Sequence, residues 1–149
     1  MWSLRSEDRL KEWKEFRKVI GSLPFDDAVQ QTVHLWSCAP FMNHYLDHSM
    51  PADWPTPWEL VSDNTYDDLA KAVGMLYTLY LSDHGRNHTF KILKVKASSG
   101  LETYNLVSID DEKYILNFTF DEVISKEQVD TEMEILQTFT DVDLQLSKY

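Results

Sequence analysis

The chain has 149 residues and a formal net charge of −11, with 43% hydrophobic and 26% charged residues. This length and ordinary composition predict one soluble globular domain, and the negative charge argues against a nucleic-acid partner because it would repel a phosphate backbone. No apolar run is long enough to span a bilayer, and Cys38 is the single cysteine, so we expect folding in a reducing, cytosolic environment.

The N-terminal part predicts two helices joined by a short turn. Apolar residues recur at helical spacing from about Leu4 to Ile20, and Gly21 ends the pattern. A second helix follows Pro24, whose fixed φ suits the first turn, and Pro40 closes it after Ala39. The two are expected to form a helical hairpin.

Residues 40–57 are irregular in pattern and hold four of the five prolines. The segment is also rich in large apolar side chains, which argues against a flexible linker and favours a packed loop or a loop completed by a partner. Aromatic and Met side chains in and beside it are therefore the predicted protein-interaction residues: Phe41, Met42, Tyr45, Trp54 and Trp58.

A short helix is predicted at Thr56, because Pro57 suits the first helical position and Glu59 completes a capping box. Apolar residues on most sides of residues 65–83 then predict a long central helix. Gly74 in its middle predicts a close crossing with a neighbouring element, since glycine there otherwise weakens a helix.

After residue 88 the apolar pattern changes to alternation. Residues 89–97, 102–109 and 113–120 read as three antiparallel strands with short turns, and one sheet face carrying Phe90, Ile92 and Tyr104 is expected to pack on the central helix. Residues 130–139 are predicted to form a C-terminal helix. The expected fold class is α+β, with a helical hairpin, a central helix on a three-stranded sheet and a terminal helix, all in the single domain 1–149.

Histidine pairs and carboxylate clusters are the candidates for a metal or acid–base site, and neither pattern is specific. His44/His48 and His84/His88 have four-residue spacing but lack the Glu of a zinc protease motif, so surface or capping roles are favoured. The acidic clusters, Asp67-Asp68 and Asp110-Asp111-Glu112, lack a calcium-loop pattern and suit helix starts and turns. We assign no catalytic residue, metal or cofactor.

The order of a buried helix and a three-stranded antiparallel sheet resembles transglutaminase-like and papain-like cysteine enzymes. The start of the central helix, at Thr65–Ala70, resembles the place where their nucleophilic Cys stands. Tyr104 or Asn105 falls at the position of the His, and Asn117 at that of the orienting residue. Without thiolate and imidazole the resemblance implies an inactive scaffold, and Cys38 is expected to be a buried structural residue unless a histidine approaches it.

Three segments also resemble small uncharacterised proteins of tailed bacteriophages: Trp54–Leu60, Asp67–Leu79 and Asp111–Phe118. This resemblance implies a virion location after synthesis in the host cytoplasm. The first hypothesis is therefore a non-enzymatic tail or baseplate protein that contacts other protein subunits, without membrane, nucleic-acid or small-molecule partners. The alternatives are a papain-like cysteine hydrolase using Cys38 and an acidic inhibitor of a host enzyme.

Overall fold

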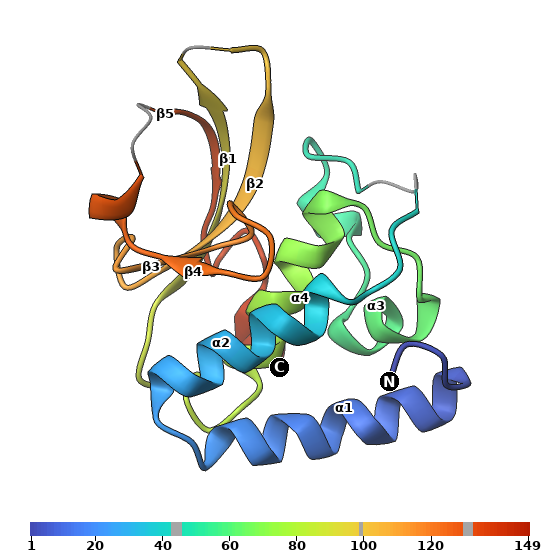
Figure 1. The fold of residues 1–149 in the computed structure, drawn as a ribbon. Helices are drawn as coiled ribbons and strands as arrows, with labels where there is room; N and C mark the ends of the chain where they lie inside the picture. Colours follow the sequence, from blue (N-terminus) through green and yellow to red (C-terminus); the bar gives the residue numbers. More distant parts are fainter. Residues whose placement is uncertain (43–45, 99, 130–132) are drawn as a thin grey trace.

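The computed structural model describes residues 1–42, 46–98, 100–129 and 133–149. Four α-helices and five strands make a mixed α+β fold, drawn in Figure 1. The helices are α1 (Ser6–Gly21), α2 (Phe25–Ser37), α3 (Pro57–Asp63) and α4 (Asp68–Tyr80). The strands are β1 (Phe90–Ala97), β2 (Thr103–Ile109), β3 (Tyr114–Leu116), β4 (Val123–Ile124) and β5 (Met133–Phe139). Short 3₁₀ helices occupy Pro51–Asp53, Lys126–Gln128 and Leu146–Lys148.

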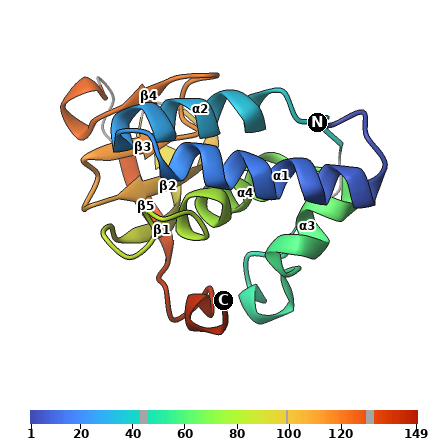
Figure 2. The same ribbon diagram turned by 90° about the horizontal axis from the view of Figure 1, so that it is seen from below.

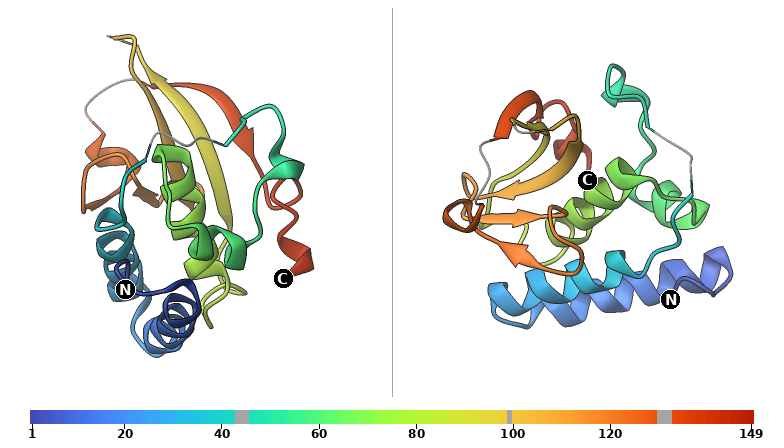
Figure 3. Two further views of the ribbon diagram at one scale, coloured as in Figure 1. Left: turned by 90° about the vertical axis from the view of Figure 1, so that its right-hand side faces the viewer. Right: turned by 45° about the horizontal axis from the view of Figure 1, so that its top comes forward.

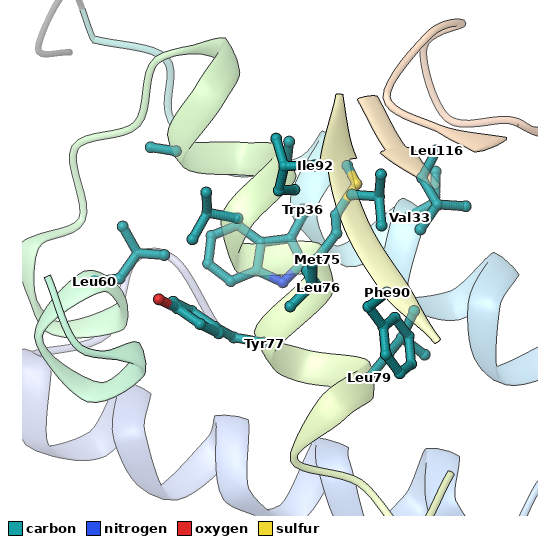
Figure 4. Packing of buried hydrophobic residues seen from close by; sticks show 14 of the residues in the cluster. Val33, Trp36, Leu60, Met75, Leu76, Tyr77, Leu79, Phe90, Ile92 and Leu116 are labelled. Carbon is teal, nitrogen blue, oxygen red and sulfur yellow. The ribbon is translucent and has the colours of Figure 1, made fainter. Parts of the chain in front are cut away.

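Helix α4 is the centre of the fold, because it contacts α2, α3, β1 and β2. Helices α1 and α2 run alongside one another and cover α4, as the view from below shows (Figure 2). The close crossing predicted at Gly74 is confirmed: a Cβ there would lie 2.3 Å from the Trp36 ring. The buried side chains around this crossing form the main core (Figure 4).

The sheet is antiparallel throughout, in the order β4-β3-β2-β1-β5. Five strands replace the three predicted, and the predicted C-terminal helix is wrong: β5 pairs with β1 along Ile92↔Phe139 to Ala97↔Met133. Residues 130–132 of the predicted helix lie outside the described residues. The apolar spacing of Met133, Ile135 and Phe139 fits an alternating strand as well as a helix, and pairing with the open edge of β1 decides between them.

The helices lie on one side of the sheet (Figure 3). Both faces of the sheet carry buried apolar side chains, the main core on the helix side and a smaller cluster on the other. Phe90, Ile92 and Val107 belong to the main core with α4, as expected for the first two. Tyr104 instead packs on the opposite face, in a smaller cluster around Leu106. Successive strand residues point to opposite faces, so it is the neighbouring Asn105 whose side chain is directed toward α4.

Local sequence signals around α3 and α4 are confirmed. Thr56 accepts a hydrogen bond from Glu59 N and the Glu59 carboxylate accepts one from Thr56 N, which completes the capping box in front of Pro57. Asp67 caps α4 by accepting from Ala70 N at 2.8 Å. Within the described ranges, no helix is both long and apolar enough to cross a membrane.

Candidate active site

Three residues far apart in the sequence meet at the start of α4. The exposed Asp68 carboxylate accepts hydrogen bonds from Asn105 N (3.1 Å) and Asn105 Nδ2 (2.9 Å) through Oδ2. Its Oδ1 accepts from Asn117 Nδ2 at 3.0 Å. Asn105 lies on β2, and Asn117 directly follows β3. The resemblance to cysteine enzymes places Asn105 and Asn117 at the His and orienting positions, and both lie at the start of α4; of the two strand candidates, Asn105 and not Tyr104 makes the contact.

Local backbone geometry places each of these groups. Asp68 begins α4 because Asp67 has extended backbone and caps the helix. Asn117 has φ of 69°, a left-handed conformation that asparagine tolerates better than most residues, and this turn directs its amide toward Asp68. The same amide donates to Asn105 O at 2.9 Å, so both asparagines are held in one network with the carboxylate.

A histidine from the irregular loop joins the network, and sequence reasoning missed this role. The half-buried His48 donates from Nε2 to Asn105 Oδ1 at 2.8 Å, because an amide oxygen can only accept. Gln137 on β5 anchors this part of the loop by donating to His48 O at 2.9 Å. Asn105 thus links an imidazole on one side to the Asp68 carboxylate on the other.

A cleft of about 260 Å³ opens beside Asp68 and Asn117. Its lining combines buried apolar side chains, half-buried or exposed aromatic rings and a cation: Val33, Met75, Phe118, Phe41, Phe120 and Lys71, among others. Burial lowers the pKa of Lys71, while the nearby Asp68 and Cys38 groups act to raise it. The carboxylate therefore stands at the edge of a space that a small group or a side chain can enter.

Cys38 is not at the start of the central helix. It forms the C-cap of α2 and is exposed, so the expectation of a buried cysteine is wrong. Among the described residues, no hydrogen bond joins its thiol to an imidazole; His44 lies outside the part of the chain that the structure describes. His34 instead contacts Asp121 at 3.1 Å, and His84 contacts Ile20 O and Leu23 O.

The remaining histidine and carboxylate candidates contact side chains near them and do not join the network at Asp68. His88 Nδ1 lies 2.6 Å from the Asp110 carboxylate, and its ring stacks on Phe25 at 3.5 Å. Asp111 lies 3.7 Å from Lys91 Nζ, and Glu112 lies 3.5 Å from Lys126 Nζ. The described residues contain no group of three or more His, Cys, Asp or Glu side chains arranged to hold a metal ion.

The predicted interaction residues occupy different surroundings. Phe41 and Met42 are exposed near the start of α4, where Met42 N donates to Tyr66 O at 3.0 Å. Trp54 is half-buried against Phe139 and donates to Asp47 O, whereas the exposed Trp58 packs on Tyr149. Tyr45 lies outside the described residues. Whether the described four contact another protein stays a prediction.

The fold has a solved counterpart. The chain matches calcium-bound LapG of Legionella pneumophila with a TM-score of 0.67 and 12% sequence identity, over 88% of this chain and 75% of that chain. LapG has the transglutaminase/papain-like cysteine protease fold, which supports the resemblance in element order. No protein-family model matches the sequence, and no curated protein matches it significantly. The resemblance to phage proteins therefore finds no support.

This match corrects the first functional hypothesis. A non-enzymatic structural role was expected, but the fold matches that of LapG, and this match agrees better with the papain-like hydrolase alternative. At 12% identity the match establishes the fold, and the chemistry has to be argued from this chain's own residues. The expected virion location and protein partners stay predictions.

Proposed function

We propose that the protein is a hydrolase of papain-like fold in which the Asp68 carboxylate, rather than a thiolate, is the reacting group. The observation that carries this proposal is the hydrogen-bonded set of Asp68, Asn105 and Asn117 at the edge of an open cleft. In the fold's order of elements, these residues stand where the nucleophile, the histidine and the orienting residue of a cysteine enzyme are expected.

The carboxylate is suited to activate water for attack on an amide or ester carbonyl. Water adds its oxygen to the carbonyl carbon while Asp68 accepts one of its protons, and the carbonyl oxygen becomes an oxyanion. When the tetrahedral intermediate collapses, the bond to the leaving nitrogen or oxygen breaks and the proton on Asp68 passes to that atom. The products are a carboxylic acid and an amine or alcohol.

The start of α4 supplies a place for the oxyanion. An α-helix leaves its first N–H groups without intrahelical acceptors, and its N-terminus carries a partial positive charge. Asp67 takes the N–H of Ala70 and Leu69 is buried, so the N–H of the exposed Asp68 is the donor for the developing negative charge. Asn105 and Asn117 hold the carboxylate in one orientation and the His48 contact fixes the Asn105 amide.

The test compares two substitutions with wild-type protein on a panel of fluorogenic peptides and nitrophenyl esters. Asp68→Asn keeps the side-chain shape but removes the base, and we expect kcat to fall by about 10²- to 10⁴-fold, the usual contribution of a general base. Cys38→Ser should leave kcat unchanged. Loss of activity in Cys38→Ser with activity retained in Asp68→Asn would transfer the reaction to the thiol and refute the carboxylate mechanism.

A further inference from the structure

The cleft beside Asp68 has an apolar floor and an aromatic rim. Val33 and Met75 are buried at its floor, whereas Phe41 and Phe120 on its rim are 64% and 77% exposed. These two rings come from distant parts of the chain, after α2 and after β3. Large aromatic side chains exposed around one hollow are unusual on a folded surface and favour a site that buries them in a complex.

The backbone holds both rims close to the reacting carboxylate. Residue 41 forms a parallel bridge with Tyr66, two residues before Asp68. On the other side, Asn117 Nδ2 donates to Asp68 Oδ1 at 3.0 Å, and Phe120, three residues later, lines the same cleft as Asp68. An apolar group bound between Phe41 and Phe120 therefore lies next to Asp68.

A cation stands on the same helix as the carboxylate. Lys71 is three residues after Asp68, a spacing that brings side chains together on one helix face, and its Nζ lies 6.0 Å from the centre of the Phe41 ring. Within the described parts of the chain no carboxylate lies within ion-pair distance of Lys71. The neighbouring Asp121 instead contacts His34. In a chain of net charge −11, this half-buried ammonium group is suited to pair with a carboxylate brought by a ligand.

We propose that this cleft selects polypeptide segments in which a large apolar side chain is followed by an acidic residue. Phe41 and Phe120 enclose the apolar side chain above the Val33–Met75 floor, and Lys71 pairs with the carboxylate. Cleavage of the bound segment at Asp68 rests on the proposed function. Binding of the segment in the cleft does not, because it requires no reaction.

The experiment measures binding in the full chain carrying Asp68→Asn, which removes cleavage as a complication. The probe is the fluorescein-labelled pentapeptide Ala-Ala-Phe-Asp-Ala with an amidated C-terminus, followed by fluorescence anisotropy. Two matched peptides replace its Phe by Ser or its Asp by Asn. We expect the parent peptide to bind at least about tenfold more tightly than the Ser peptide, because enclosing one aromatic side chain gives a difference of this size. The Asn peptide should bind several-fold more weakly than the parent.

Substitutions in the protein test which residues give the selectivity for the peptide. Phe120→Ser should weaken binding of the parent peptide about tenfold and of the Ser peptide hardly at all, and Lys71→Met should remove the preference for Asp over Asn. Leu101→Ser changes an apolar residue that is 90% exposed and does not line the cleft, and Lys14→Met removes an exposed cation of α1. Both controls should bind like the parent protein.

Equal affinities for the three peptides, or unchanged binding by Phe120→Ser and Lys71→Met, would overturn the selectivity. Peptide binding without any cleavage by the protein that keeps Asp68 would refute the proposed hydrolase function and leave the cleft's selectivity standing. Cleavage without a preference among the three peptides would support the hydrolase function and refute the selectivity of the cleft.

Discussion

Helix α4 carries two polar networks, and they differ in access to solvent. In its middle, the fully buried Thr78 hydroxyl accepts from Trp13 Nε1 (3.0 Å) and Trp36 Nε1 (2.9 Å) and donates to Gly74 O (2.7 Å). At its start, the Asp68 carboxylate is also surrounded by donors, but it is exposed beside a cleft. The first network has no room for a further partner, whereas the second can meet one.

The comparison separates two uses of a polar side chain. At Thr78 the hydrogen bonds allow two tryptophans to be buried without leaving their N–H groups unpaired, so the network serves stability. At Asp68 two asparagines hold a charged group where the fold itself does not require one. Functional sites are where a chain keeps polar groups that packing alone would not select.

The largest effect is expected from Thr78→Val, which keeps the side-chain shape and removes the hydroxyl. Two buried indole N–H groups then lose their acceptor. Because each unpaired buried donor costs about 1–3 kcal/mol, we expect the free energy of unfolding to fall by roughly 2–6 kcal/mol. Urea denaturation followed by tryptophan fluorescence measures it. Thr138→Val, on an exposed residue of β5, is the control and should change little. A loss below about 1 kcal/mol would mean that the Thr78 network does not support the core.

A smaller loss is expected from Gly74→Ala, one turn earlier on the same helix. The added methyl group meets the Trp36 ring at 2.3 Å, so the ring or the helix has to move. Forcing an extra carbon into a packed core costs about 1–3 kcal/mol, against the gain of up to about 1 kcal/mol that alanine normally gives over glycine in a helix. Gly100→Ala, whose Cβ would meet nothing closer than 3.9 Å, is the matched control in thermal unfolding. Unchanged stability of Gly74→Ala would show that the Trp36 ring or the two helices can move to admit the methyl group at little cost.

Substitution of Asp68 should affect stability much less than substitution of Thr78 or Gly74. Asp68→Asn removes an exposed charge, keeps one oxygen that can accept from the buried Asn105, and loses the exposed hydrogen bond from Asn117 Nδ2. We therefore expect the free energy of unfolding to change by less than about 1 kcal/mol. The same denaturation measurement checks this, with Asp67→Ala as a neighbouring substitution that removes the cap of α4 and should cost more, about 1 kcal/mol. A larger loss for Asp68→Asn than for Asp67→Ala would assign Asp68 to the fold rather than to a reaction.

The features that can be read from the sequence are mainly local ones. The helix predicted at residues 65–83, observed as Asp68–Tyr80, and the Thr56–Glu59 box depend on residues within a few turns of one another. Gly74 indicates a close crossing, which is confirmed, but its partner Trp36 lies in a distant segment that the sequence does not identify. The positions of Asn105 and Asn117 beside the start of that helix follow from the order of one helix and two adjacent hairpin strands, whereas the sequence indicates Asp68 only as a charge at the helix start.

What the sequence does not disclose depends on contacts between distant segments. The pattern of Met133–Phe139 fits two periods, and only pairing with β1, about 40 residues away, selects a strand. His48 reaches Asn105 across 57 residues, from a loop without a repeating pattern, so its spacing to His44 carries no information about its partner. Likewise, nothing local relates Phe41 to Phe120, although they border one cleft.

The smallest expected effect concerns Asp110 and its partner His88, at the far end of the sheet from the proposed site. Burial acts to raise the pKa of Asp110, but hydrogen bonds from His88 and from Thr89 N outweigh it, and the pKa lies below its ordinary value. A carboxyl group with a lowered pKa in the folded state stabilises the fold at pH values above its unfolded pKa of about 3.9. That stabilisation is lost as the pH falls through the lower, folded-state pKa.

The melting temperature of wild-type protein should therefore exceed that of Asp110→Asn at about pH 5, and the difference between the two melting temperatures should narrow toward about pH 3. Asp111→Asn, at a carboxylate whose side chain is 89% exposed, should show no such gap. A gap that stays constant with pH would mean that the His88–Asp110 contact stabilises the sheet by packing and not by charge.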